Sequence, residues 1–132
     1  MSYFVGILDG AKEVWGVRIP DFSGCVGGGS TAEAAIADAI IALRDVAAHC
    51  LSQGIALPKP STIAEIISSG EMQKGESTVM IPLLLDEGRS VRANVTFDAG
   101  LLHAIDEAAD ARGVTRSAFL ASAARDKIIQ SA

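Results

Sequence analysis

Three polar side chains at alternate positions could read the edges of DNA bases. Arg92, Asn94 and Thr96 share one face of the segment Ser90–Phe97, in which every second residue is apolar. Such alternation is typical of a β-strand. Arginine suits guanine, asparagine suits adenine, threonine can contact thymine, and a two-stranded ribbon fits the major groove of DNA. We therefore predict that these three residues are a base-reading set.

A second set of polar residues lies where a DNA phosphate could dock. Thr115 is expected to cap a helix, so Thr115, Arg116 and Ser117 would place free backbone N–H groups and a cation at a helix start. Arg89 and Arg92 add positive charge near the expected ribbon. We predict that Thr115, Arg116 and Ser117 contact the DNA backbone.

The elements that would position both sets are one strand and two helices. Asp98 offers an N-cap for an amphipathic helix that runs to Arg112, Gly113 ends this helix, and Thr115 begins the next one. Residues 89–132 are too few to bury a core from these elements alone. A second copy would pair the strands antiparallel and pack four helices against their inner face. The predicted dimer core consists of Val91, Ala93, Val95, Phe97, Leu101, Ile105, Phe119 and Leu120.

This part of the chain resembles the ribbon-helix-helix family of DNA-binding domains. The resemblance covers Val91–Ile129, and its most specific stretches are Val91–Phe97 and Gly113–Leu120. It implies a homodimer, or a higher even oligomer, that binds operator DNA. The alternative interpretation of the same residues is a solvated edge strand followed by a helical hairpin.

Residues 1–88 are expected to form an antiparallel sheet. Two strands are predicted over Tyr3–Leu8 and Val14–Ile19, and a short third strand is expected to open at Cys25 and Val26. A fourth strand is predicted over Thr78–Leu85. Pro82 places the last strand at an edge or a bulge, because proline cannot donate a ladder hydrogen bond. In the second strand Trp15, Val17 and Ile19 share one face, and Val14, Gly16 and Arg18 share the other.

Two helices are predicted between these strands. Ser30 and Glu33 match a capping box at the start of a long alanine-rich helix that ends at Gly54, and Thr62 with Glu65 matches another before a short helix. Gly27–Gly29 is expected to be a flexible loop. The resulting order, β-β-β-α-α-β, indicates an α+β fold. The buried stripe of the long helix is predicted to contain Ala32, Ala35, Ile36, Ala39, Ile40, Leu43, Val46, Ala47 and Cys50.

Charge is divided unevenly along the chain. The formal net charge is −5, of which residues 1–88 carry −6 and residues 89–132 carry +1. An acidic body attached to a nearly neutral DNA-reading end suits a basic partner protein. The sequence shows no membrane span and no signal peptide, and its two cysteines lack zinc-site spacing. A cytoplasmic protein is therefore expected.

The first part of the chain resembles the N-terminal domain of HicB-type antitoxins, which is similar to a truncated RNase H fold. The resemblance rests on Ile19–Cys25, Ser30–Ala35 and Leu57–Ser61. It implies two domains, a HicB-like toxin-binding domain over residues 1–88 and a DNA-binding and dimerisation domain over residues 89–132. The expected function is to mask a small basic toxin, a HicA-like ribonuclease, and to repress the antitoxin's own operon. The alternative is a stand-alone repressor whose N-terminal domain senses a ligand or multimerises.

The sequence does not favour catalytic chemistry. A metal-dependent nuclease would need clustered carboxylates, but Asp9, Asp38 and Asp86 are expected to be solvated surface acids. His49 and His103 are expected at the surface, and no nucleophile–base set is apparent. We therefore predict no enzyme activity, no catalytic residues, no metal site and no cofactor.

Overall fold

The computed structural model describes residues 2–85 and 90–130 of the chain. The chain divides into two compact units, which we call unit 1 (Met1–Glu87) and unit 2 (Gly88–Ala132). The predicted linker at 86–88, Arg89 and the predicted domain boundary between residues 88 and 89 lie outside the described residues.

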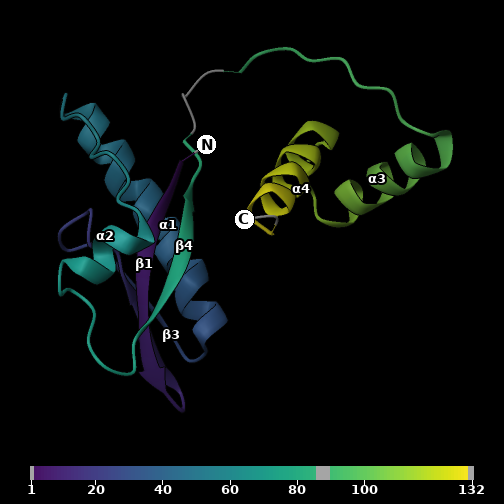
Figure 1. Cartoon of the computed structure of the whole chain (residues 1–132). Coiled ribbons are helices and arrows are strands. Elements are labelled where there is room, and N and C mark those ends of the chain that lie inside the picture. Colours follow the sequence, from purple (N-terminus) through teal and green to yellow (C-terminus); the bar gives the residue numbers. More distant parts are fainter. Residues whose placement is uncertain (1, 86–89, 131–132) are drawn as a thin grey trace. The chain divides into compact units, whose positions relative to one another are not determined.

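Unit 1 is built on a four-stranded antiparallel sheet with the strand order β3-β2-β1-β4 (Figure 1). The long helix α1 packs on one face of this sheet, and the short helix α2 packs on the other. This arrangement confirms the α+β class and the predicted element order, whereas similarity to a truncated RNase H fold stays a prediction. The elements of unit 1 are β1 (Ser2–Ala11), β2 (Val14–Arg18), β3 (Val26–Gly29), α1 (Ala32–Ser52), α2 (Ile63–Ser68) and β4 (Ser77–Leu83).

Alternation along the strands sends side chains to two separate clusters. Phe4 of β1 and Ile81 of β4 join the larger cluster beneath α1, where Phe4 makes an edge-on ring contact with Phe22. Val5 and Ile7 point to the opposite face and pack with Ile66 of α2. One strand therefore feeds both cores, because consecutive side chains leave a strand on opposite sides.

The predicted features of β2 and β4 are confirmed. Trp15, Val17 and Ile19 lie in the cluster beneath α1, as the alternation indicated. β4 is an edge strand of the sheet, in agreement with Pro82. The bounds differ by a few residues, since β1 extends to Ala11 and forms a hairpin with β2.

The start of α1 corrects one prediction. Its N-cap is Thr31, whose hydroxyl accepts a hydrogen bond from the backbone N–H of Ala34 at 3.0 Å, rather than Ser30. Thr31 has an extended backbone and its carbonyl accepts the first helical hydrogen bond from Ala35, so Ser30 falls before the cap. The second predicted capping box, Thr62 with Glu65, is confirmed with both of its hydrogen bonds.

The glycine run before α1 corrects another prediction. Gly27–Gly29 is not a flexible loop, because it forms most of β3 and pairs with β2. A Cβ atom at Gly27 would lie 2.4 Å from the backbone nitrogen of Ala39, and one at Gly29 would lie 2.7 Å from the Cβ of Ala34. The missing side chains let α1 cross the sheet in close contact with β3.

The buried stripe of α1 is narrower than predicted. Four residues at four-residue spacing have no exposed surface, whereas Ile36, Ile40 and Val46 are partly buried at its sides and Cys50 is half-buried. Small side chains at most of the central positions match the close approach to β3. The fully buried residues are Ala35, Ala39, Leu43 and Ala47.

Unit 2 is a helical hairpin preceded by an extended segment. Helices α3 (Ala99–Ala111) and α4 (Arg116–Gln130) pack together, and Gly113 turns the chain between them with a φ of +67°. Asp98 caps α3 as predicted, accepting hydrogen bonds from the N–H groups of the first turn. The guanidinium of Arg112 lies over the ring of Phe119, 5.4 Å from its centre.

The segment 90–98 forms no strand in the single chain. A strand is defined by ladder hydrogen bonds to a neighbour, and no other described segment pairs with these residues. The predicted ribbon requires a second copy, so it stays a prediction.

The glycines of β3 provide a test of this packing. Gly27→Ala should lower the free energy of unfolding by about 2–3 kcal/mol, because its methyl group meets the backbone of α1. Gly28→Ala is the matched control: its nearest atom would be 3.6 Å away, so stability should hold or rise by about 0.5 kcal/mol. Urea unfolding measures both values. Equal stabilities for the two variants would contradict the close contact.

Candidate functional site

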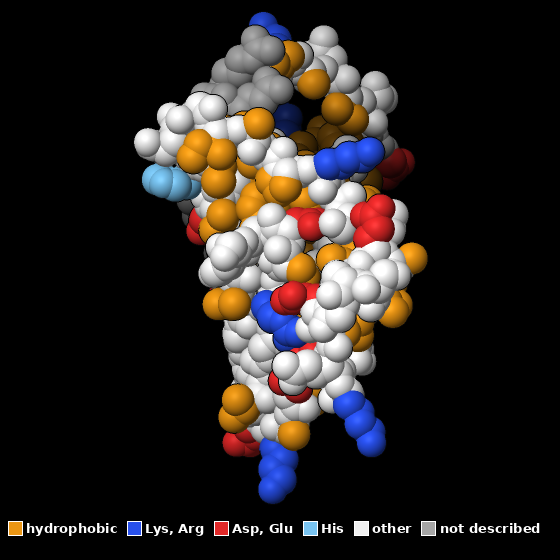
Figure 2. All heavy atoms as spheres, turned by 60° about the vertical axis from the view of Figure 1, so that its left-hand side comes forward, with side chains coloured by type: hydrophobic (Ala, Val, Ile, Leu, Met, Phe, Trp, Pro, Cys, Tyr) orange, Lys and Arg blue, Asp and Glu red, His pale blue; other side chains and the backbone are white. Residues whose placement is uncertain are grey.

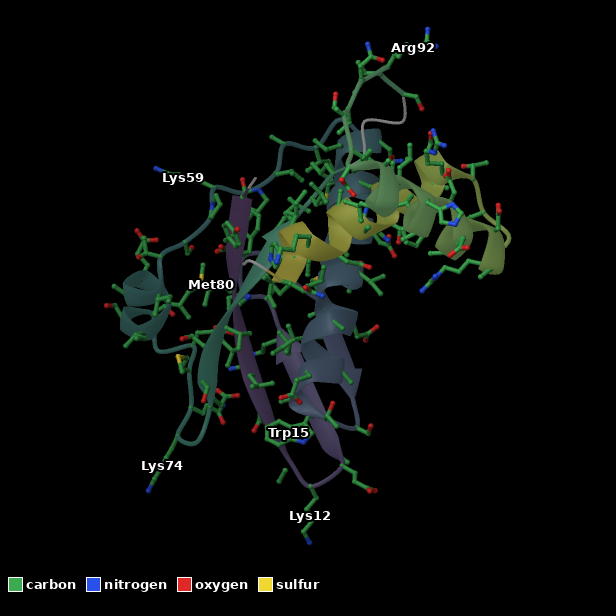
Figure 3. The ribbon with its side chains drawn as sticks, turned by 90° about the vertical axis from the view of Figure 1, so that its right-hand side faces the viewer. Lys12, Trp15, Lys59, Lys74, Met80 and Arg92 are labelled. Carbon is green, nitrogen blue, oxygen red and sulfur yellow. The ribbon has the colours of Figure 1, made fainter. Side chains whose placement is uncertain are left out.

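The predicted base-reading residues are all exposed in unit 2. Arg92, Asn94 and Thr96 occur at alternate positions of the extended segment, and Arg92 points away from the helices (Figure 3). The apolar residues between them are also exposed: Val91 by 77% and Val95 by 69%. An apolar face that is exposed along a whole segment is typical of a surface that another chain covers.

A hollow of about 310 Å³ lies between this segment and the helical hairpin. The structure thereby brings Asn94 of the base-reading set close to Arg116 and Ser117 of the phosphate set. The apolar side chains of Phe97 and Leu120 line the same hollow. Arg92, Thr96 and Thr115 do not line it.

The start of α4 holds an ion pair that sequence reasoning missed. Thr115 caps α4 as predicted, since its hydroxyl accepts from the N–H of Ala118 at 3.1 Å. The guanidinium of Arg116 donates to both carboxylate oxygens of Asp106 on α3, each at 2.8 Å. This hydrogen bonding lowers the pKa of Asp106 and raises that of Arg116. A phosphate at Arg116 must therefore compete with Asp106.

The predicted dimer core is only partly covered within the single chain. Ile105 is buried between the two helices, and Phe97, Phe119 and Leu120 are half-buried. Val91, Ala93, Val95 and Leu101 remain exposed. Completion of this core by a second copy stays a prediction.

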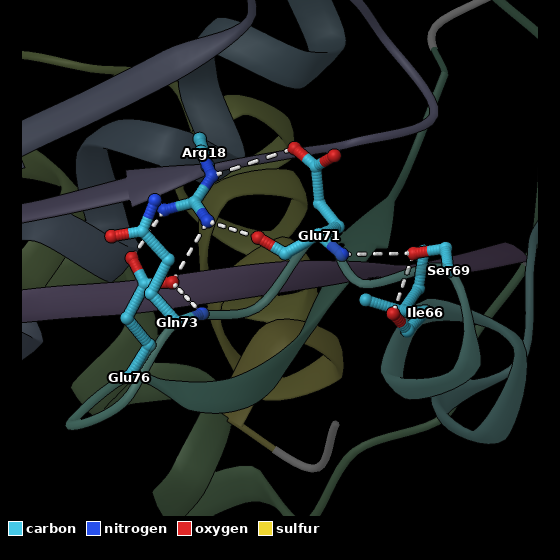
Figure 4. Close-up of polar contacts among 6 residues, drawn as sticks. All are labelled: Arg18, Ile66, Ser69, Glu71, Gln73 and Glu76. Carbon is cyan, nitrogen blue, oxygen red and sulfur yellow. Dashed lines mark hydrogen bonds and ion pairs between the residues drawn. The ribbon is translucent and has the colours of Figure 1, made fainter.

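Unit 1 carries a charged cluster on the sheet face opposite α1 (Figure 4). Arg18 of β2 donates to both carboxylate oxygens of Glu76 and to the backbone carbonyl of Glu71. Glu76 also accepts from the N–H of Gln73 at 2.7 Å, and its side chain is only 7% exposed. The hydrogen bonds from Arg18 and Gln73 lower the pKa of Glu76 from about 4.5 to about 2. The cluster fastens the loop 71–76 to the sheet.

Neither the loop nor its ion pair was predicted. The one signal in the sequence is the position of Arg18, which alternation places on the face away from Trp15 and Val17. On the face drawn in Figure 2, acidic and basic side chains stand next to each other rather than gathering by sign.

The carboxylates considered for a nuclease do not converge. The carboxylate of Asp38, on α1, accepts a hydrogen bond from the backbone N–H of Gly28 at 2.9 Å. Asp9 lies near the C-terminal end of β1, and Asp86 is outside the described residues. Within residues 2–85 and 90–130, no three His, Cys, Asp or Glu side chains are placed to hold a metal ion.

Burial raises the pKa of the Cys25 thiol. His103 is exposed and lies 3.1 Å from Glu107.

No helix in the described part of the chain is long and apolar enough to cross a membrane.

The sequence matches one family model, described as a HicB-like antitoxin of a bacterial toxin–antitoxin system, over residues 3–124. None of the curated proteins matches the sequence significantly.

Similar solved structures are also those of HicB antitoxins or of a HicA–HicB toxin–antitoxin complex. The antitoxin HicB of Burkholderia pseudomallei is 29% identical with a TM-score of 0.58, and the similarity covers 94% of this chain and 96% of that one. The antitoxin HicB3 is 27% identical with a TM-score of 0.55, over 97% of this chain and 98% of that one. A chain from a HicA3–HicB3 toxin–antitoxin complex shares the fold at 18% identity and a TM-score of 0.53, over 64% of this chain and 99% of that one.

The charged cluster of unit 1 predicts a change of stability in acid. The pKa of Glu76 is lower in the folded state than in the unfolded chain. The contribution of its ionised carboxylate to the free energy of unfolding is therefore complete above about pH 4.5 and is lost as the pH falls toward 2. Glu76→Gln should remove this part of the pH dependence, as measured by urea midpoints from pH 7 to pH 2. Glu71→Gln keeps the hydrogen bonds between Arg18 and Glu76 and should retain most of it. Parallel pH profiles for wild type and Glu76→Gln would contradict the assignment.

Unit 2 generates a second prediction. A fragment of residues 89–132 should fold only as a dimer, because its apolar segment and half-covered core need a second copy. The melting midpoint should therefore rise with protein concentration, and sedimentation should give the mass of a dimer. A monomeric fragment whose midpoint does not depend on concentration would disprove this.

Proposed function

The chain belongs to the HicB-like antitoxin family of bacterial toxin–antitoxin systems, and from this premise we propose a specific division of its work. Unit 1 binds and masks a small basic, HicA-like toxin that cleaves RNA. Unit 2 dimerises and represses the operon by reading operator DNA with a two-stranded ribbon. The observation that carries the proposal is that the family match runs over residues 3–124, across both compact units.

Charge supports the assignment of toxin masking to unit 1. An RNA-cleaving toxin must present cations to phosphates. Residues 1–88 carry a net charge of −6, whereas residues 89–132 carry +1. The unit with the acidic excess is therefore the one whose surface best complements such a toxin.

The pattern of exposure supports the assignment of DNA reading to unit 2. Arg92, Asn94 and Thr96 are exposed, and the apolar residues that alternate with them are exposed as well. Pairing with the same segment of a second copy would cover the apolar face and satisfy the backbone N–H and C=O groups. It would leave the three polar side chains, twice over, on the opposite face.

The phosphate contacts of unit 2 follow from α4. Arg116 and Ser117 stand at the N-terminal end of this helix, where backbone N–H groups favour an anion. On DNA, the guanidinium of Arg116 exchanges one or both of its hydrogen bonds to Asp106 for a phosphate oxygen. In the free protein, Asp106 holds the side chain of Arg116 in place. The same ion pair limits the attraction of Arg116 to DNA of any sequence.

The base-reading strand can be tested without disturbing the fold. Arg92→Ala combined with Asn94→Ala should abolish the preference for operator over scrambled DNA, since each good base contact contributes about 1–3 kcal/mol of discrimination. The melting midpoint should barely move because both side chains are exposed. Lys59→Ala removes a cation from unit 1 and should leave operator preference intact. An unchanged preference in the double variant would show that another element reads the DNA.

Growth rescue tests the other half of the proposal. Cells that express the toxin should be rescued by the double variant, and also by a truncation that ends at Gly88, although less well if dimerisation adds avidity. Loss of rescue in the folded double variant would show that unit 2 itself contacts the toxin. Operator binding without any rescue, by the wild-type protein, would favour a stand-alone repressor instead.

A further inference from the structure

The glycines of the described strands fall into two groups. A Cβ atom at Gly6, Gly10, Gly27 or Gly29 would meet other atoms at 2.4–2.8 Å, and Gly10 also has a φ of +152°, so packing requires these glycines. A Cβ at Gly16 would find its nearest atom, the carbonyl oxygen of Gly27, at 3.7 Å, and one at Gly28 would find its nearest at 3.6 Å. Neither of these two has a positive φ. Packing and backbone conformation therefore explain the first group but not the second.

The two unexplained glycines are neighbours. Gly16 of β2 and Gly28 of β3 are paired in the register of the sheet, and both lie on the face opposite α1. Glycine weakens the interior of a strand, and where it occurs there it often marks a place where another backbone approaches closely. The pair leaves a patch of bare backbone on this face.

A hollow of about 310 Å³ lies over this part of the sheet, and we call it the β2–β3 hollow. Its rim includes two strongly exposed apolar side chains, Val14 at 78% and Val26 at 61%. Ile7 and Gly16 also line it, and Gly28 is the strand partner of Gly16, just outside this lining. Helix α2 contacts Val5 and Ile7 on the same face, but neither Val14 nor Val26 belongs to its cluster. The hollow therefore offers a partner two exposed apolar side chains at its rim and a glycine at its floor.

Charged groups at the edge of the hollow are net acidic. Asp9 and Arg18 line it, and Arg18 is bound to Glu71 and Glu76. These four groups carry one positive and three negative charges, which leaves a net charge of −2. In the described residues Asp9 has no hydrogen bond and no ion pair of its own and only attracts Arg18 electrostatically, so its carboxylate can accept a hydrogen bond from a cation of a partner.

We propose that the β2–β3 hollow is the surface of unit 1 on which the basic toxin docks. An apolar segment of the toxin lies over Gly16 and Gly28 between Val14 and Val26, and a lysine or arginine of the toxin pairs with Asp9. This inference rests on the proposed function, since it names the surface that masking uses. A second copy of this chain is a poorer occupant, because it would bring two acidic rims and two units of charge −6 together.

The experiment places a side chain in the β2–β3 hollow by replacing Gly16, which lines it. Gly16→Val adds a β-branched side chain that suits a strand and finds no atom closer than 3.7 Å at its Cβ, so the melting midpoint should hold or rise. Ala37→Val, on an exposed position of α1, adds the same kind of bulk elsewhere on unit 1. The probe is a purified HicA-like toxin, chosen as the product of a short basic reading frame next to the gene for this chain where one is found, and the full-length variants are titrated with it by calorimetry.

The expected result is a loss of about tenfold or more in toxin affinity for Gly16→Val, with Ala37→Val unchanged. Gly28→Val should repeat the loss from the neighbouring strand, which guards against an individual folding defect. Asp9→Asn should weaken binding about three- to tenfold and reduce its dependence on salt, because it removes one charge pair.

The contradicting results are distinct. If wild-type protein fails to bind the toxin, the proposed function is wrong. If wild type binds and folded Gly16→Val binds equally well, the toxin docks elsewhere and only the present inference is overturned. Sedimentation of the free variants adds a further outcome: a changed oligomeric state with unchanged toxin affinity would assign the hollow to contacts between copies of this chain.

Discussion

Every strand must pair its backbone N–H and C=O groups, and this requirement shapes both units of the chain. In unit 1 the sheet ends at β3 and β4, and each edge is protected. The carboxylate of Asp38 accepts from the N–H of Gly28 on β3, and Pro82 on β4 has no N–H to offer. In unit 2 the segment 90–97 has the alternation of a strand, and it is paired with no strand among the described residues. A second copy of the same segment would satisfy that requirement, so the proposed dimerisation and the proposed DNA reading would depend on one event.

Local signals predicted most of the secondary structure. The caps at Thr62, Asp98 and Thr115 were found correctly because a cap depends on a hydroxyl or carboxylate and on the residues within one turn of it. The order β-β-β-α-α-β followed from alternation and four-residue spacing for the same reason. Ser30 was preferred over Thr31 because the sequence offers two adjacent hydroxyls, and only the backbone path decides between them.

Tertiary contacts account for what the sequence could not predict. Gly27–Gly29 has the composition of a loop, but it pairs with β2 as a strand, and α1 passes too close for a side chain at Gly27 and Gly29. The pairs Arg18–Glu76 and Arg116–Asp106 join residues that have no characteristic spacing along the chain. At the candidate sites, alternation therefore predicted the face of the sheet on which Arg18 lies, but no signal predicted that Arg116 is already bound to a carboxylate. Charge divided between the units was visible from the start, whereas the hollow over Gly16 required the folded sheet.

In the proposed dimer, residues 91–97 pair with their counterparts in a second chain. Amide hydrogen exchange of the full-length protein, resolved by residue, tests it most directly, because an antiparallel pair of strands protects the N–H groups that donate across the interface. Slow exchange is expected at alternate residues of this segment, with protection that increases as the protein is concentrated. Fast exchange at every one of these residues, in a sample shown by sedimentation to be dimeric, would contradict it.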